Sequence, residues 1–226
     1  MSLNKSLTLS STSSLEKFQK IQGLYAITAP ELIAPEKLVA SIEKAILGGA
    51  KIVQYRNKLA SHAQQYQQAR ELSHLCKQHQ ACFIINDNPQ LAKAVNADGV
   101  HVGKEDGKIT DARKQLGSQA IIGVSCYNKL ENAQKAIAQG ADYVAFGRFF
   151  PSKTKPDAVQ ADLQLLEQAS EQLAVPIVAI GGIKQDNAQQ LITRGAHAIA
   201  VINDLFHDDQ AIYHTAKIYQ ALFKQN

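Results

Sequence analysis

The clearest structural unit in the sequence is PEKLVASIEKAILGGAKIVQY (35–55), in which a helical pattern runs into two glycines and a short apolar segment. Leu38, Ile42, Ala45 and Ile46 recur at the spacing of one helix face, and Gly48-Gly49 are typical of a helix stop. The following KIVQY (51–55) is too short for a buried helix and is typical of a strand. The stretch therefore predicts a helix that leads directly into a strand.

The same alternation continues along the chain. Eight short apolar runs predict strands: GLYAIT (23–28), KIVQY (51–55), CFIIN (82–86), DGVHV (98–102), AIIGVS (120–125), DYVAFG (142–147), PIVAIGG (176–182) and AIAVI (198–202). Several are apolar throughout, as in parallel sheets covered on both faces. Helical segments separate them, among them NKLENAQKAIAQG (128–140), which we expect to be capped by Asn128 and to end at Gly140. This pattern favours an α/β protein, a single-domain (β/α)8 TIM barrel.

A weak internal repeat supports the barrel. A small or turn residue followed by Ala precedes every second strand, as Gly49-Ala50, Asn96-Ala97, Gly140-Ala141 and Gly195-Ala196, which indicates a (βα)2 unit used four times. A doubly wound open sheet is the structural alternative, although no G-x-G-x-x-G follows the first strand. We expect residues 1–20 to form a polar N-terminal extension and residues 21–226 to form the barrel catalytic domain.

Composition narrows the possible functions. The 226 residues include 24 Lys+Arg and 20 Asp+Glu, a net charge of +4, with 45% hydrophobic residues. Such a composition is too apolar for a disordered chain, and the charges form no long basic run for nucleic acid. No apolar run is long enough to span a membrane, and MSLNKSLTLSSTSS (1–14) lacks the apolar core of a secretory signal. We expect a cytoplasmic protein, in which Cys76, Cys82 and Cys126 are reduced, structural thiols without zinc-ligand spacing.

Polar residues follow seven of the expected strands, at the end where a barrel carries its active site. A phosphate could be surrounded by the backbone of Gly181-Gly182, the backbone after Ile202, and the hydroxyls of Ser152 and Thr154. Arg56, Lys58 and Lys155 follow three different strands and could converge on a polyanion. The plainer alternatives are ordinary glycine turns and solvated surface cations.

Two carboxylates accompany these cations. Asp87 and Asp106 beside a phosphate make electrostatic sense if a hard cation such as Mg²⁺ bridges them, although each could instead be a turn or cap residue. Ligand type alone would also permit Mn²⁺. His101 lies between Val100 and Val102, so it could point into the barrel or out towards the helices. We assign it mainly to structure.

The segment from about Gly23 to Phe206 resembles the thiamine phosphate synthase family, barrel enzymes of thiamine biosynthesis. The resemblance rests on GLYAIT (23–28), VQYRNK (53–58), INDNPQLAKAVNADGVHVGKED (85–106), IIGVS (121–125), DYVAFGRFFPSKTKPDA (142–158), VPIVAIGGI (175–183) and AIAVINDLF (198–206). It implies a transferase that couples 4-amino-2-methyl-5-pyrimidinylmethyl diphosphate with 4-methyl-5-(2-phosphoethyl)thiazole. Pyrophosphate leaves in a dissociative, Mg²⁺-assisted substitution, and thiamine phosphate forms.

The resemblance also implies residue roles. The pyrimidine diphosphate would be held by Gln54, Tyr55, Arg56, Asn57, Lys58 and Asn86, and its diphosphate would also contact Ser125 and Lys155. The thiazole phosphate would be held by Ser152, Lys153, Thr154, Gly182, Ile202 and Asn203. One Mg²⁺ ion per active site would be bound by Asp87 and Asp106. Lys155, Ser125 and Arg56 are the expected catalytic residues. No nucleic acid or membrane partner is expected.

Four positions depart from the commonest family wording: Tyr127, Arg148, Ser152 and Asn203. Asn203 stands where Ser is usual, which leaves its side-chain contact open although its backbone amide remains available. Two rival functions are a thiazole tautomerase on the same barrel and a non-catalytic barrel that binds a phosphorylated ligand. Asp87, Asp106 and Thr154-Lys155-Pro156 favour the synthase over the tautomerase, and the retained cations and carboxylates argue against a non-catalytic barrel.

Overall fold

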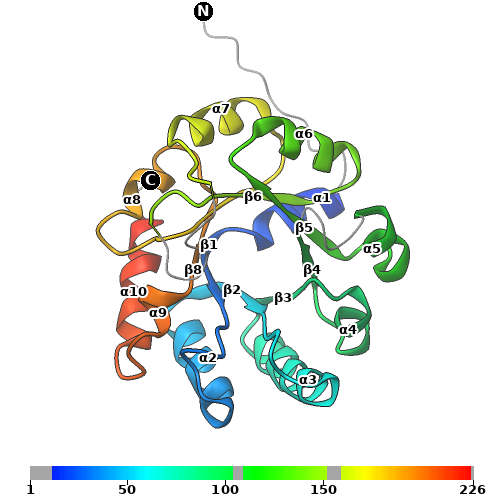
Figure 1. Ribbon diagram of the computed structural model, residues 1–226, viewed down its shortest axis with the longest axis vertical. Coiled ribbons are helices and arrows are strands. Elements are labelled where there is room, and N and C mark those ends of the chain that lie inside the picture. Colours follow the sequence, from blue (N-terminus) through cyan, green and yellow to red (C-terminus); the bar gives the residue numbers. More distant parts are fainter. Residues whose placement is uncertain (1–11, 104–108, 152–158, 225–226) are drawn as a thin grey trace, which may run out of the picture.

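Eight parallel strands close into a barrel in chain order, and helices surround it (Figure 1). The computed structural model describes residues 12–103, 109–151 and 159–224. The strands are β1 (Gly23–Ile27), β2 (Ala50–Tyr55), β3 (Cys82–Asn86), β4 (Gly99–Val102), β5 (Ile121–Tyr127), β6 (Tyr143–Phe146), β7 (Ile177–Ile180) and β8 (Ala198–Val201). β1 pairs with β8 through Leu24 and Ile199, which completes the ring. The predicted (β/α)8 barrel and all eight predicted strand positions are confirmed.

The helices follow the strands around the outside of the barrel. They are η1 (Pro35–Lys37), α2 (Leu38–Leu47), α3 (His62–Gln78), α4 (Pro89–Ala94), α5 (Ile109–Leu116), α6 (Leu130–Ala138), α7 (Gln164–Gln172), α8 (Gln189–Ile192), α9 (Asn203–Phe206) and α10 (Ile212–Leu222). Among the described residues, no helix is long and apolar enough to cross a membrane.

Each strand is apolar on both faces because each face packs against a different layer. Outward side chains such as Val53, Phe83 and Val144 join the helices in the main core. Inward side chains fill the barrel in a second cluster, which includes Ile52 and Ile84. Continuous apolar runs rather than alternating ones are the sequence signature of this double burial.

Local signals explain where most elements end. α2 stops at Leu47, and Gly49 has φ 117°, a left-handed conformation that glycine adopts without strain. α6, however, begins at Leu130 with Lys129 as its N-cap residue, so the prediction of a cap at Asn128 is wrong. The Asn128 amide instead donates to the carbonyl oxygen of Gln160 at 3.4 Å. A tertiary contact has replaced the local cap.

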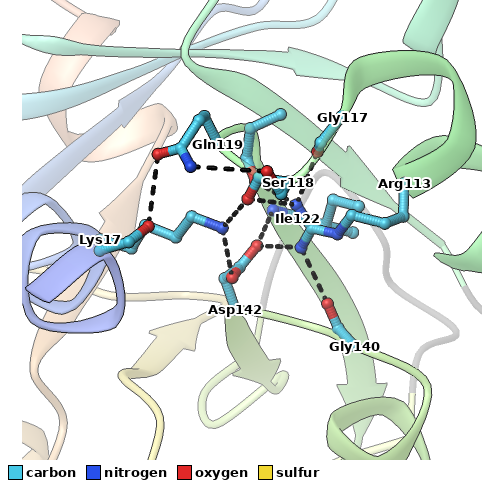
Figure 2. Close-up of polar contacts among 10 residues, drawn as sticks. Lys17, Arg113, Gly117, Ser118, Gln119, Ile122, Gly140 and Asp142 are labelled. Carbon is cyan, nitrogen blue, oxygen red and sulfur yellow. Dashed lines mark hydrogen bonds and ion pairs between the residues drawn. The ribbon is translucent and has the colours of Figure 1, made fainter. Parts of the chain in front are cut away.

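Part of the polar extension is ordered. Helix α1 (Thr12–Lys20) lies at the amino ends of the strands, where Lys17 Nζ bonds Asp142 Oδ1 at 3.0 Å (Figure 2). Asp142 also accepts from Arg113 and, at 2.8 Å, from the backbone N–H of Ile122. Helix α1 is thereby fixed to the end of the barrel opposite the predicted active site.

All three cysteines are buried and unpaired, as expected of structural thiols. Burial raises the pKa of the Cys76 and Cys126 thiols to about 12, so both are protonated near neutral pH. Neither thiol is therefore a reactive nucleophile.

Candidate active site

A cavity of about 730 Å³ opens at the carboxyl ends of the strands. All eight strands contribute to its wall, and seven of the predicted site residues lie there: Gln54, Arg56, Asn86, Ser125, Gly182, Ile202 and Asn203. These residues are far apart in the sequence, and closure of the barrel brings them together. Predicted residues Asp106, Ser152, Lys153, Thr154 and Lys155 lie outside the described residues.

A larger and more open groove lies near the amino end of β3, alongside α1 and α3. Its lining includes long polar side chains such as Lys20, Arg70 and Lys77. Barrel enzymes carry their chemistry at the opposite end of the strands. The smaller cavity is therefore the candidate active site.

The predicted substrate-binding residues at the end of strand β2 and just after it point in two directions, some into the cavity and others towards helix α3. Gln54 and Arg56 line the cavity, whereas Tyr55 and Asn57 are not part of its wall. The Tyr55 hydroxyl donates to Gln68 Oε1 of α3 at 2.8 Å, and the Asn57 amide donates to the same oxygen at 3.2 Å. Burial raises the pKa of Tyr55 to about 12. Strand alternation turns these two side chains towards α3, so they lie beside the cavity residues and not among them.

Asp87 forms a compact polar cluster at the end of β3. It has φ 60°, and its backbone N–H donates to the carbonyl oxygen of His101 at 2.8 Å. Its carboxylate accepts from Asn86 Nδ2 at 2.6 Å and lies 3.0 Å from Lys58 Nζ. Lys58 and Asp87 are thus beside Asn86, which lines the cavity, although neither is itself part of the wall.

The donor chemistry of this cluster fits Mg²⁺. The described residues contain no group of three or more His, Cys, Asp and Glu side chains suited to a fully protein-bound metal. Mg²⁺ is usually held by one or two carboxylates together with substrate phosphate oxygens and water. Asp87 offers one such carboxylate at the mouth of the barrel, next to two expected diphosphate ligands.

The ends of β7 and β8 form the other side of the cavity. Gly181 and Gly182 have φ 103° and 66°, and a Cβ atom on Gly182 would lie 2.3 Å from the carbonyl oxygen of Pro151. The close approach of the backbone therefore requires glycine at these positions whether or not an anion binds there. After β8, the Phe206 N–H makes a helical bond to the carbonyl oxygen of Ile202. The amides that precede Phe206 in α9 therefore need acceptors from outside the helix.

Asp204 adds a carboxylate to the cavity wall after β8. Its Oδ2 accepts a hydrogen bond from the Tyr219 hydroxyl of α10 at 2.7 Å. Burial and this bond raise the pKa of Tyr219 far above its usual value, so the phenol remains a donor. The contact ties the Asp204 carboxylate to α10.

A buried polar chain runs across the barrel at the inner end of the cavity. Gln54 Nε2 donates to the Tyr25 hydroxyl at 2.8 Å, and the Tyr25 and Tyr143 hydroxyls are 2.9 Å apart. The Tyr143 hydroxyl lies 2.9 Å from His101 Nδ1, and His101 Nε2 lies 2.9 Å from Ser125 Oγ. His101 thus points into the barrel, a question that the sequence left open. The contributions of Tyr25 and Tyr143 were not foreseen, and their only sequence signal is a phenol within an otherwise apolar strand.

Fold and site together define a class: (β/α)8 barrel enzymes whose active-site cavity lies at the carboxyl ends of the strands. The model of the thiamine monophosphate synthase family matches residues 24–205. The chain belongs to this family.

Individual relatives agree with this assignment. A thiamine-phosphate synthase of Alcanivorax borkumensis is 51% identical over 209 residues, covering 92% of this chain and 96% of that one. One from Methylobacillus flagellatus is 54% identical over 186 residues, covering 82% and 88%. The solved thiamine phosphate pyrophosphorylase of Pyrococcus furiosus superposes with a TM-score of 0.83 at 34% identity, covering 93% of this chain and 98% of that one. The family resemblance of the sequence motifs is confirmed, and so is the assignment to an enzyme.

Proposed function

We propose that the protein is a thiamine phosphate synthase that joins 4-amino-2-methyl-5-pyrimidinylmethyl diphosphate to 4-methyl-5-(2-phosphoethyl)thiazole. The bond between the pyrimidine methylene and the diphosphate oxygen breaks, pyrophosphate leaves, and the thiazole nitrogen bonds to the methylene. One observation carries the proposal: seven predicted site residues, from five separate family motifs, line a single cavity at the mouth of the barrel. Family membership over residues 24–205 supports the same reaction.

The pyrimidine diphosphate would lie on the side of the cavity formed by β2, β3 and β5. Gln54, Arg56 and Asn86 line that side. Asp87 contacts both Asn86 and Lys58, and so holds Lys58 near the same side. Arg56 offers a planar fork for phosphate oxygens, and Lys58 offers a compact charge. Ser125, together with Lys155, would contact the leaving diphosphate.

Asp87 and Asp106 would hold Mg²⁺ against the diphosphate. When bound, the ion supplies positive charge that offsets the negative charge developing on the leaving group. The polar cluster of Asn86, Asp87 and Lys58 supports this role, because it provides a carboxylate already oriented at the strand ends.

The thiazole phosphate would lie at the ends of β7 and β8. Gly182, Ile202 and Asn203 line this side, and the amides at the start of α9 need acceptors from outside the helix. Ser152, Lys153 and Thr154 would complete the phosphate site. Asn203, where the family commonly has Ser, would contribute mainly its backbone N–H.

The arrangement suits a dissociative substitution. Arg56, Lys58 and Lys155 would stabilise charge on the leaving diphosphate, which is the main electrostatic demand of the step. The apolar side chains of Ile27, Val178 and Ile180 in the cavity wall would shield an electron-deficient methylene from water. No proton has to be removed from either reacting atom, so this chain needs no general base.

A coupling assay tests the proposal. Purified protein is supplied with both substrates and Mg²⁺, and thiamine phosphate is detected by oxidation to fluorescent thiochrome, with EDTA as the control. Product that disappears with EDTA supports the synthase. Folded protein that makes no product, but shifts a double bond in a carboxythiazole phosphate, would instead be a tautomerase. Binding of the phosphates without either reaction would leave a ligand-binding barrel.

We further propose that the protein works in the cytoplasm, with small molecules as its reaction partners. The three buried, unpaired cysteines support a reducing compartment. A fluorescent fusion, viewed by microscopy together with a cytoplasmic marker, checks the location.

A further inference from the structure

The buried chain from Gln54 to Ser125 has a definite direction, and this direction bears on how Ser125 meets its ligand. The chain passes through Tyr25, Tyr143 and His101, whose exposed fractions are 1%, 0% and 9%. It joins five strands, β2, β1, β6, β4 and β5, across the barrel interior. A polar chain in so apolar a region must satisfy its hydrogen bonds internally.

The order of the protons follows from the Gln54 end. The Gln54 amide nitrogen can only donate, so the Tyr25 oxygen accepts that bond. The Tyr25 proton then needs an acceptor, and within the described part of the chain its only other polar partner is the Tyr143 hydroxyl. The reverse order would leave the proton of Tyr25, a side chain only 1% exposed, without an acceptor among the described residues, and buried donors of this kind are rare in native structures.

The same order continues to Ser125. Tyr143 has accepted from Tyr25, so its own proton goes to His101 Nδ1. An imidazole that accepts at Nδ1 carries its proton on Nε2, and this N–H donates to Ser125 Oγ. The Ser125 hydroxyl proton is then directed to an acceptor in the cavity.

We propose that this chain fixes Ser125 as a hydrogen-bond donor to the cavity, with Tyr25, Tyr143 and His101 as positioning residues. A hydroxyl fixed as a donor favours a ligand that offers only acceptor oxygens, such as a diphosphate. The inference rests on the proposed function for the identity of that ligand. The proton order itself does not depend on turnover.

The chain is built into the packing of the strands. The His101 and Tyr143 rings stack with centroids 5.5 Å apart, and Gly123 on β5 lies against the Tyr143 ring. A Cβ atom on Gly123 would lie 1.9 Å from Tyr143 Cζ, so only glycine leaves room for the phenol at this depth. The Tyr143 hydroxyl is thereby held at one position between Tyr25 and His101.

The first test is the tautomer of His101, read from ¹⁵N NMR of the unliganded protein. The resonances are assigned by their absence in His101→Gln. We expect a proton on Nε2 and none on Nδ1 at neutral pH. A proton on Nδ1 would reverse the chain and overturn the proposal, whether or not the protein turns over.

The second test asks whether Tyr143 acts through Ser125. Tyr143→Phe should lower kcat/KM for the pyrimidine diphosphate by about tenfold, the effect of one hydrogen bond, and leave KM for the thiazole phosphate unchanged. In a Ser125→Ala background the same change should have no further effect. Two independent, multiplicative losses would show a merely structural role and refute the positioning assignment.

Controls keep the outcomes distinct. Tyr213→Phe removes a hydroxyl from the partly exposed side of α10, away from the cavity, and should leave all constants unchanged. Tyr25→Phe replaces Tyr143→Phe if the latter does not fold. If the wild-type protein makes no thiamine phosphate, the proposed function fails, and calorimetry with inorganic pyrophosphate tests the hydrogen-bond chain instead. A lower affinity for pyrophosphate in Tyr143→Phe, with no such loss when Ser125→Ala is already present, supports the positioning role. Equal affinities of the wild type and Tyr143→Phe oppose it.

Discussion

Lys17 Nζ on helix α1 lies 3.0 Å from Asp142 Oδ1, at the start of strand β6, although 125 positions separate the two residues. The side chains are 13% and 17% exposed, so the ion pair is largely shielded from water. The same carboxylate pairs with Arg113 on α5 and accepts from the N–H of Ile122 on β5 (Figure 2). One aspartate therefore joins the N-terminal helix to two neighbouring strands and to α5.

Asp142→Ala should lower the free energy of unfolding by about 3 kcal/mol. It removes the carboxylate partner of two partly buried cations, which keep only carbonyl acceptors, and the acceptor of the Ile122 N–H. Urea denaturation measures the change. Asp209→Ala is the matched control, since Asp209 also pairs with two lysines, Lys37 and Lys44, but at an exposed position. It should change stability much less. Equal losses of unfolding free energy for the two variants would show that the shielded contacts of Asp142 stabilise the fold no more than the exposed ion pairs of Asp209.

Asp87→Asn should abolish turnover or raise the Mg²⁺ concentration required for it, since an amide is a poor Mg²⁺ ligand. The fold should survive, because Asn tolerates the φ of 60° found at this position. A Mg²⁺ titration of the coupling rate measures the effect, and circular dichroism checks the fold. Asp209→Asn, at a residue that is not part of the cavity wall, should keep the wild-type Mg²⁺ dependence. Normal activity of Asp87→Asn at low Mg²⁺ would remove Asp87 from the metal site.

Lys155→Ala should lower kcat by about 10²–10³-fold, the loss expected for one preorganised transition-state donor. Steady-state kinetics with each substrate varied in turn measures it. A change confined to KM for the thiazole phosphate would assign Lys155 to the second substrate.

Gly123→Ala should destabilise the barrel by about 1–3 kcal/mol through overpacking against the Tyr143 ring. Thermal unfolding measures the loss. In a Tyr143→Leu background, where the ring is absent, the same alanine should be nearly neutral. A loss of the same size in both backgrounds would locate the strain elsewhere.

His197 should make stability depend on pH. Burial lowers its pKa, and its Nδ1 accepts from the N–H of Ile177 at 3.1 Å, which requires an unprotonated nitrogen. Below the ordinary histidine pKa, about 6.5, the unfolded chain binds the extra proton more readily than the folded one. Stability contributed by this group should therefore rise with pH through that region and level off above it.

His197→Asn keeps an acceptor near the same place and removes the titration. Urea denaturation at pH 5 and pH 7 should show a smaller difference for this variant than for the wild type. An unchanged pH dependence would show that other groups produce it.

Much of the site was predictable because it follows from chain order. Gln54, Asn86 and Ser125 each follow or end an apolar run, and parallel strands in a barrel present all such ends to one mouth. Tyr55 and Asn57 are adjacent to the cavity residues Gln54 and Arg56 but are not part of the cavity wall. Successive side chains on an extended segment face opposite ways, so closeness in sequence does not ensure a place in the cavity.

The eight strands, the amino-to-carboxyl polarity of the barrel and the family were all determined by local patterns and motifs in the sequence. Only the tertiary structure decided the direction of His101, the internal role of Tyr25 and Tyr143, and the docking of α1. The physical reason is that strands buried on both faces carry apolar residues on both, so the sequence does not mark which face is inside. Closure of the barrel selects that face, and with it the hydrogen-bond chain that ends at Ser125.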